Sequence, residues 1–144
     1  MTDLHCHILP AIDDGAKNAK VSMELLRMQN DAGVTDIVCT PHFNPDSQNL
    51  EDFIDKRYRS ARYLADYVFC SELPVRLKFG AEVRISPTIL DLDFLPLCFQ
   101  KTKVMLLEMP RTLRPQWDTN VIYQLTLGGV IPLIAHIERY PYVQ

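Results

Sequence analysis

The sequence has no long hydrophobic run and no excess of positive charge. No apolar segment approaches the roughly 20 residues that a membrane-spanning helix needs. The formal net charge is −3, which provides no basic surface for a nucleic-acid backbone. The N-terminus has neither a basic leader nor a cleavable apolar segment. We therefore expect a cytoplasmic globular protein with no membrane span and no nucleic-acid partner.

Cysteine is scarce, and the four that occur are far apart: Cys6, Cys39, Cys70 and Cys98. Their spacing excludes a Cys-x-x-Cys metal knuckle, and we predict buried, reduced thiols. Cys70 and Arg76 do match the Cys-x5-Arg spacing of thiol-based phosphatases. However, Glu72 would repel a phosphate and Pro74 removes a backbone donor from the expected phosphate cradle. We therefore expect no cysteine nucleophile.

The length and the order of apolar segments predict one α/β domain over residues 1–144, with 47% hydrophobic and 23% charged residues. We predict strands at residues 2–6, 36–40, 75–83, 103–109 and 130–136. Helices are predicted from a cap at Asn18 to Gly33, after the loop at 41–49, between Pro87 and Pro96, and at 116–127. The first two helices carry apolar residues at helical spacing: Val21, Leu25, Met28 and Ala32 in one, and Ile54, Tyr58, Ala61, Ala65 and Val68 in the other. Such alternation predicts parallel strands joined by right-handed crossovers, in a sheet or a barrel.

The chain has only four histidines, and each lies at or after a predicted strand. His5 and His7 are two residues apart, so a strand would point both imidazoles to the same face. The other candidates follow the second to fifth strands: His42, Glu82, Glu108 and His136. Any one of them could be a core residue or a salt-bridged carboxylate. Together at the carboxyl ends of parallel strands they predict a metal site, because burying them without a cation would be costly.

Five ordered segments of the chain resemble the polymerase-and-histidinol-phosphatase superfamily. They are Asp-Leu-His-Cys-His (residues 3–7) with Asp-Asp-Gly (13–15), Thr-Pro-His (40–42), Gly-Ala-Glu (80–82), Leu-Glu-Met-Pro (107–110) and Ala-His-Ile-Glu-Arg-Tyr (135–140). They are most similar to its CpsB-type branch of bacterial protein-tyrosine phosphatases. The resemblance implies a distorted, parallel-stranded TIM-like barrel, of which this chain holds about five βα units of seven. It also implies two to three divalent ions, usually manganese, with iron or zinc possible.

The resemblance further implies how the ions would be held. One ion would bind His5, His7 and a bridging Glu82, and a second would share Glu82 and add Glu108 and His136. A third would use Asp14 and His42, with Asp13 as the alternative to Asp14. Asp3 is expected to orient a ligand imidazole from behind.

The implied activity is metal-assisted hydrolysis of phosphotyrosine in the tail of a bacterial tyrosine kinase of capsule or exopolysaccharide synthesis. Arg139 would bind the phosphoryl oxygens, unless it is a surface residue paired with Glu138. Arg111 and Arg114 are weaker candidates for the same role. Two alternative functions remain open: hydrolysis of a small phosphate ester such as histidinol phosphate, and an inactive metal-binding remnant.

Members of this family end with an Asp-x-His motif, which has no counterpart after Tyr142. We therefore expect a C-terminally truncated domain with at most weak activity by itself. An incomplete barrel would leave the first and fifth strands as open edges, which favours pairing with a second copy of the chain.

Overall fold

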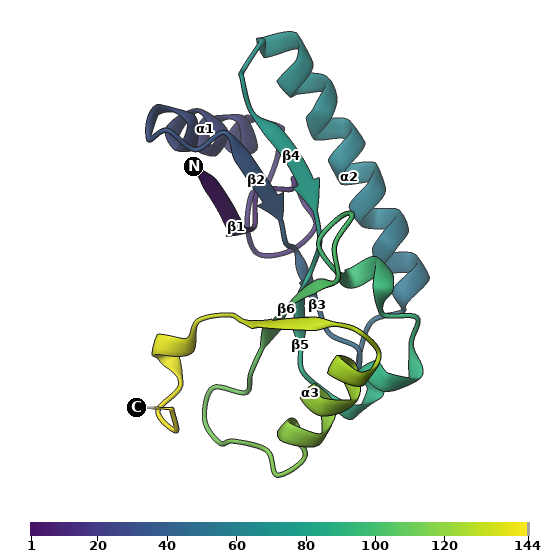
Figure 1. Ribbon diagram of the computed structural model, residues 1–144. Coiled ribbons are helices and arrows are strands. Elements are labelled where there is room, and N and C mark those ends of the chain that lie inside the picture. Colours follow the sequence, from purple (N-terminus) through teal and green to yellow (C-terminus); the bar gives the residue numbers. More distant parts are fainter. Residues whose placement is uncertain (144) are drawn as a thin grey trace. The chain divides into compact units, whose positions relative to one another are not determined.

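The structure, a computed structural model, describes residues 1–143 and divides the chain into two compact units. Unit 1 comprises Met1–Pro41 and Glu51–Phe79, and unit 2 comprises His42–Leu50 and the chain from Gly80 onward. Every strand pairing in both units is parallel (Figure 1). The predicted α/β class with parallel strands is thus confirmed, whereas a single domain over residues 1–144 stays a prediction. Within residues 1–143, no helix is long and apolar enough to cross a membrane.

Unit 1 is built on a three-stranded sheet with the order β1-β2-β4. Its strands are β1 (Thr2–Cys6), β2 (Asp36–Cys39) and β4 (Arg76–Phe79). Helix α1 (Ala19–Asp31) connects β1 to β2, and α2 (Leu50–Ser71) precedes β4 (Figure 1). A parallel pair needs such a crossover because the chain must return to the same end of the sheet. The predicted strands at 2–6 and 36–40 are confirmed to within one residue.

Helix α1 begins and ends where the sequence predicts. The Asn18 side chain accepts a hydrogen bond from the Val21 amide, and Gly33 follows the helix with a φ of +83°. The buried face is different from the predicted one, since Met23 and Leu26 are buried while Met28 is 68% exposed. Both sets of residues have helical spacing, and contact with the rest of the unit selects between them.

Helix α2 shows a similar difference. Phe53, Ala61 and Leu64 are its buried residues, whereas Tyr58 is 63% exposed and Ala65 is also exposed. The predicted stripe was therefore correct at Ala61 and wrong at Tyr58 and Ala65. The residues that α1, α2 and the strands bury together form the core of unit 1: Ile8, Leu9, Ile12, Met23, Leu26, Ile37, Cys39, Ala61 and Leu64.

Unit 2 is built on a four-stranded sheet with the order β3-β5-β6-β7. The strands are β3 (His42–Phe43), β5 (Glu82–Arg84), β6 (Val104–Glu108) and β7 (Ile131–Ile134). Its helices are α3 (Asp118–Leu127) and the short 3₁₀ turns η1 (Pro87–Asp91), η2 (Leu95–Leu97) and η3 (Ile137–Arg139). The predicted fourth and fifth strands and the helix at 116–127 are confirmed with slightly shorter bounds.

The predicted third strand, residues 75–83, was wrong as a single element. It is two strands, because β4 pairs with β2 in one sheet and β5 pairs with β3 and β6 in the other. Gly80 and Ala81 separate them, and a Cβ at Gly80 would lie 2.7 Å from the Phe99 ring. The predicted loop at 41–49 also contains the short strand β3. Over the described residues 1–143, the five predicted strands are consequently seven.

The cysteine prediction is confirmed in part. Cys39 and Cys98 are buried, Cys6 is partly buried, and all four thiols are free. Cys70 is exposed, which contradicts the prediction for that residue. It lies in the last turn of α2 and not in a loop, so its backbone is helical and cannot form an anion cradle.

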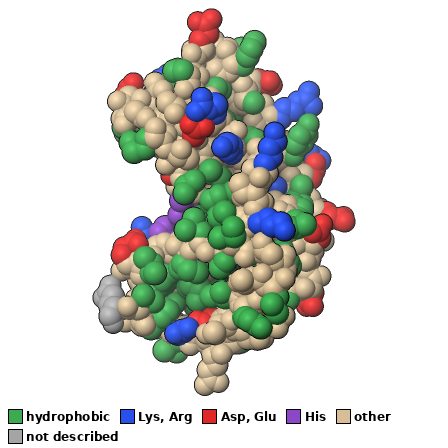
Figure 2. Space-filling model, in the orientation of Figure 1, with side chains coloured by type: hydrophobic (Ala, Val, Ile, Leu, Met, Phe, Trp, Pro, Cys, Tyr) green, Lys and Arg blue, Asp and Glu red, His purple; other side chains and the backbone are tan. Residues whose placement is uncertain are grey.

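Hydrophobic side chains also reach the surface of both units, and Figure 2 shows several on one face. In unit 1, Met28 and Phe69 are 68% and 85% exposed, and in unit 2 Leu113 is 78% exposed. Lys and Arg side chains are separated by other residues on the face that Figure 2 shows.

Candidate metal centre

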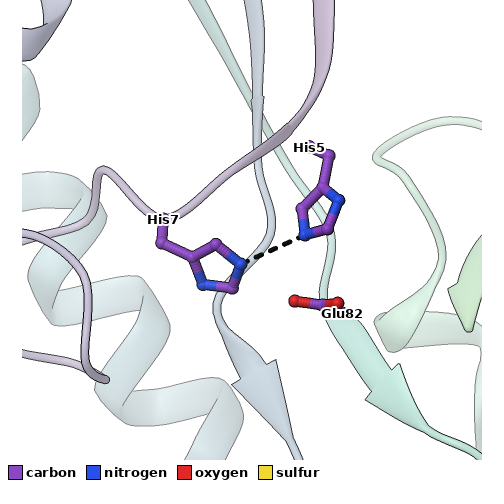
Figure 3. A group of neighbouring side chains, drawn as sticks. All are labelled: His5, His7 and Glu82. Atoms are coloured by element: carbon purple, nitrogen blue, oxygen red, sulfur yellow. Dashed lines mark hydrogen bonds between the residues drawn. The ribbon is translucent and has the colours of Figure 1, made fainter. Parts of the chain in front are cut away.

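Unit 1 brings the first two predicted ligands together. His5 lies in β1 and His7 directly after it, and their Nε2 atoms are 3.1 Å apart (Figure 3). The ring centroids are 5.2 Å apart, with the planes tilted by 56°. The two imidazoles therefore direct a nitrogen to one point, as the two-residue spacing predicted.

Asp13 fixes the orientation of the His7 ring. Its Oδ2 lies 2.8 Å from His7 Nδ1, and its Oδ1 accepts a hydrogen bond from the Gly15 amide at 3.0 Å. Because a carboxylate only accepts hydrogen bonds, Nδ1 carries the proton in a neutral His7 ring, and Nε2 then has the lone pair that an ion needs. This carboxylate–imidazole pairing is how proteins commonly orient a metal-binding histidine.

Gly15 is required at the end of the Asp-Asp-Gly turn. A Cβ at this position would collide with the His7 carbonyl oxygen and lie 2.6 Å from His7 Cβ. The same carbonyl accepts a hydrogen bond from the Ala16 amide at 3.1 Å. The turn therefore packs directly on His7, and only glycine allows the two backbones to approach this closely.

The expected role of Asp3 was wrong, and Asp13 has that role instead. Asp3 Oδ1 accepts from the His5 backbone amide at 3.0 Å, and Oδ2 accepts from Gln29 Nε2 at 2.7 Å. Asp3 thus stabilises the β1 backbone. With Asp13 bound to His7 and to the turn, Asp14 remains the better candidate for the ligand of the third predicted ion.

Unit 2 contains a second cluster, which is centred on Glu82. This residue is fully buried at the start of β5, and each carboxylate oxygen has an imidazole beside it. His136 Nε2 lies 3.1 Å from Oε1, and His42 Nδ1 lies 3.3 Å from Oε2. The register of the parallel sheet creates the second contact, since His42 in β3 pairs with Glu82 in β5.

Glu108 joins this cluster from the end of β6. One ligand atom each from His42, Glu82 and Glu108 lies within 4.8 Å of the other two. Two carboxylates this close repel each other in a buried setting unless a proton or a cation lies between them. The two carboxylates and the flanking imidazoles therefore fit a divalent ion, and a mixed nitrogen and oxygen set suits manganese, iron or zinc.

The backbone of His136 is in a conformation that few side chains adopt. It has φ +51° and ψ +37°, in the left-handed region, two residues after the end of β7 and directly before η3. Histidine tolerates this region better than most residues, but it still costs free energy. Such conformations are concentrated at functional sites, which agrees with the predicted role of this residue.

The seven predicted ligands are thus divided between the two units, and the structure brings together those that belong to the same unit. His5, His7 and Asp14 belong to unit 1, whereas His42, Glu82, Glu108 and His136 belong to unit 2. The second predicted ion draws its three ligands from unit 2 alone. The first and third predicted ions combine residues of both units and stay predictions.

Three arginines are the predicted candidates for binding the substrate phosphate. Arg139 Nε lies 3.5 Å from Glu138 Oε1 on the surface, which is the alternative that the sequence left open. Arg114 is bound to Asp118 at 2.6 Å. Arg111 Nη2 lies 3.5 Å from Glu108 Oε1, so it is the one of these three for which a contact with a candidate ligand is described.

Parallel α/β units with histidine and glutamate clusters at strand ends define a class of metal-binding α/β proteins. The family model for capsular polysaccharide synthesis, CpsB/CapC, matches residues 1–144. The chain therefore belongs to the CpsB/CapC family, and the resemblance predicted from the sequence is confirmed.

Individual relatives agree with this assignment. The chain is 34% identical to the tyrosine-protein phosphatase YwqE of Bacillus subtilis over 142 residues, which cover 96% of this chain and 55% of YwqE. It is 28% identical to the tyrosine-protein phosphatase CpsB of Streptococcus agalactiae over 146 residues, covering 97% of this chain and 58% of CpsB. The chain thus spans about half the length of the curated relatives that it matches.

A solved structure is also similar. It comes from work on YwqE from Bacillus subtilis and CpsB from Streptococcus pneumoniae, which are described as unique metal-dependent tyrosine phosphatases. The TM-score is 0.86 at 34% sequence identity, over 99% of this chain and 58% of the other. This similarity supports the predicted fold class of the family independently of the sequence segments.

Proposed function

We propose that this chain forms part of a metal-dependent phosphatase that hydrolyses phosphotyrosine in proteins. The observation that carries the proposal is the buried Glu82 carboxylate with an imidazole at each oxygen and Glu108 beside it. The family assignment and the names of the relatives point to the same chemistry. We further propose manganese as the natural ion, the tyrosine-rich tail of a bacterial kinase as the substrate, and the cytoplasm as the location.

Each residue has a role in the proposed reaction. His42, Glu82, Glu108 and His136 would hold an ion in unit 2, and His5 and His7 would contribute a second pair of ligands. Asp14 would add a carboxylate ligand to those of His5 and His7. Asp13 would hold the proton of His7 on Nδ1 and so leave Nε2 available to the ion. Bound ions would make a water molecule acidic enough to attack near neutral pH and would offset the charge of the phosphoryl oxygens.

The substrate phosphate also needs hydrogen-bond donors. Arg139 is 54% exposed and would bind the phosphoryl oxygens by exchanging its contact with Glu138 for a bidentate one. A guanidinium suits this geometry better than an ammonium group. We therefore expect Arg139→Lys to lower kcat/KM by about tenfold or more, with little change in the affinity for the ion.

The proposal is tested by measuring manganese-dependent phosphate release from a phosphotyrosine peptide by the 144-residue chain. Release should disappear with EDTA and in His136→Ala, and it should persist in Cys70→Ser. A panel with histidinol phosphate and a phosphoserine peptide tests the substrate class. No release from any substrate would contradict activity of this chain by itself, and faster release from histidinol phosphate would contradict the proposed substrate.

Self-association is a separate part of the proposal. β1 and β7, which correspond to the predicted first and fifth strands, are edge strands of their sheets. Unpaired edge strands favour contact with another chain. Light scattering should therefore show dimers or larger species at micromolar concentration, and a monodisperse monomer would contradict this part.

A further inference from the structure

Two tyrosines fasten the segment after β7 to the end of β6. Tyr140 is 1% exposed, and its hydroxyl oxygen accepts a hydrogen bond from the Met109 amide at 3.0 Å. Tyr142 stacks on Tyr140 with ring centroids 5.6 Å apart and an interplanar angle of 14°. The Tyr142 hydroxyl donates to the Pro110 carbonyl oxygen at 2.6 Å. Both hydrogen bonds thus reach the two residues directly after Glu108.

The bond from Met109 to Tyr140 involves the peptide group that Glu108 and Met109 share. The Glu108 carbonyl oxygen of this group accepts a hydrogen bond from the Ile85 amide at 2.9 Å, just after β5. The peptide plane is therefore held at both ends, by β5 through its carbonyl and by Tyr140 through its amide. Since this plane sets the direction of the Glu108 side chain, Tyr140 limits where the Glu108 carboxylate can lie.

Tyr140 is also linked to the second ligand of the cluster. It ends the η3 turn whose first hydrogen bond runs from the Arg139 amide to the His136 carbonyl oxygen at 2.8 Å. The left-handed backbone of His136 needs support from its surroundings, because it is not the conformation this residue would adopt alone. Anchoring the far end of η3 at Tyr140 supplies such support.

The Tyr140 hydroxyl suits this position because it stays protonated. Burial raises the pKa of Tyr140 most, the hydrogen bond from the Met109 amide lowers it by less, and the Glu108 and Glu82 carboxylates raise it further. A neutral hydroxyl does not repel the two carboxylates and can still accept from the amide.

We propose that Tyr140 is a positioning residue of the unit 2 metal centre. It fixes the peptide after Glu108 and the turn after His136, and it thereby sets the separation of these two ligands. The inference rests on the proposed function, since Tyr140 has this role only if the cluster binds a divalent ion. Tyr142 supports it by stacking on the Tyr140 ring.

The test is a titration of the 144-residue chain with Co²⁺, followed by the visible absorption of the bound ion. Tyr140→Phe keeps the ring and removes the oxygen that holds the Met109 amide. We expect about tenfold weaker binding, as for other residues that orient ligands, and altered intensities of the absorption bands. Tyr123→Phe removes an exposed hydroxyl in α3 and should bind Co²⁺ as the unchanged chain does.

Circular dichroism and thermal melts without metal show whether each variant is folded. A purely structural role for Tyr140 would lower the metal-free melting temperature and leave the affinity and spectrum of the folded protein unchanged. If Tyr140→Phe does not fold, Tyr142→Leu replaces it in the titration. That variant removes the stacking and the bond to Pro110, and it should weaken Co²⁺ binding by about twofold to fivefold.

The outcomes separate the two proposals. Unchanged affinity and spectrum in folded Tyr140→Phe, or in Tyr142→Leu when that variant replaces it, overturn the positioning role and leave the proposed function standing. No Co²⁺ binding by the unchanged chain overturns both. Weaker binding with altered bands in Tyr140→Phe, and none of these changes in Tyr123→Phe, supports the positioning role.

Discussion

The two units assemble their candidate ligand sets in different ways. In unit 1, the groups that orient His7 come from the next eight residues, and Asp13 and Gly15 contact it directly. In unit 2, the cluster depends on four segments that are distant in sequence, and the sheet register brings His42 against Glu82. A local turn can position a ligand without the rest of the fold, whereas a cluster of this second kind exists only when the sheet has formed.

The largest effect should follow from changing Glu82. Glu82→Gln removes the charge that lies between the two imidazoles and leaves an amide that cannot bind both in the same way. We expect at least 100-fold weaker Co²⁺ binding to the unit 2 cluster, measured by titration. Glu51→Gln, on the exposed first turn of α2, is the matched control and should have no effect. Equal affinity in both variants would show that Glu82 is not a ligand.

Changing Gly15 tests the local arrangement in unit 1. Gly15→Ala forces the turn and His7 apart, and we expect a loss of about 1–3 kcal/mol in the free energy of unfolding, measured in urea. Weaker metal binding should accompany it. Gly33→Ala is a control that should lose stability for a different reason. A Cβ added at Gly33 would meet no atom within 4 Å, but the φ of +83° disfavours any side chain.

The control should lose about 1–2 kcal/mol of stability from its left-handed backbone and bind metal normally. If Gly15→Ala also binds metal normally, the turn stabilises the fold without positioning His7.

Features that depend on nearby residues could be predicted from the sequence, whereas features that depend on sheet pairing could not. The strand at residues 2–6 and the Asn18 cap depend on neighbouring residues, and both are found where they were predicted. The break between β4 and β5 could not be predicted, because residues 75–83 continue one apolar pattern and only the pairing with β2, β3 and β6 divides them. The buried face of α1 was ambiguous for the same reason. The candidate ligands were found as residue types after strands, but the contact of His42 with Glu82 required the sheet register.

A smaller effect is expected in the pH dependence of unit 2. Burial raises the pKa of Asp118, but hydrogen bonds from Arg114 and Thr119 outweigh it and hold the pKa below its usual range. A lowered carboxyl pKa stabilises the folded state above the pKa of the unfolded chain, and this contribution is lost as the pH falls through the folded pKa. Asp118→Asn should therefore destabilise the protein at pH 7 and much less near pH 3, measured by urea unfolding. An equal loss at both values would exclude the ionic contribution.

The smallest effect is expected from alkylating the thiols, which should leave the activity unchanged. Burial, together with the charge of Asp3, raises the pKa of Cys6 to about 11, and burial also raises the pKa values of Cys39 and Cys98. The thiolate is the reactive form, so these three should react slowly with iodoacetamide at pH 7.5. Exposed Cys70 should be labelled first, as mass spectrometry of peptides can show. Labelling of Cys39 before Cys70 would mean that the core of unit 1 opens readily.

The discontinuity of the two units has a consequence for protein synthesis. Every strand of unit 1 has emerged from the ribosome once residue 79 has left the exit tunnel. Strand β3, however, lies between the two parts of unit 1 in the sequence and belongs to the sheet of unit 2. The contact of His42 with Glu82 can therefore form only once Glu82 has emerged, and His136 comes last, on the order of seconds later at ordinary rates of translation. During that interval β3 is an open strand whose own sheet is still incomplete, which makes it the point where a chaperone would be most useful.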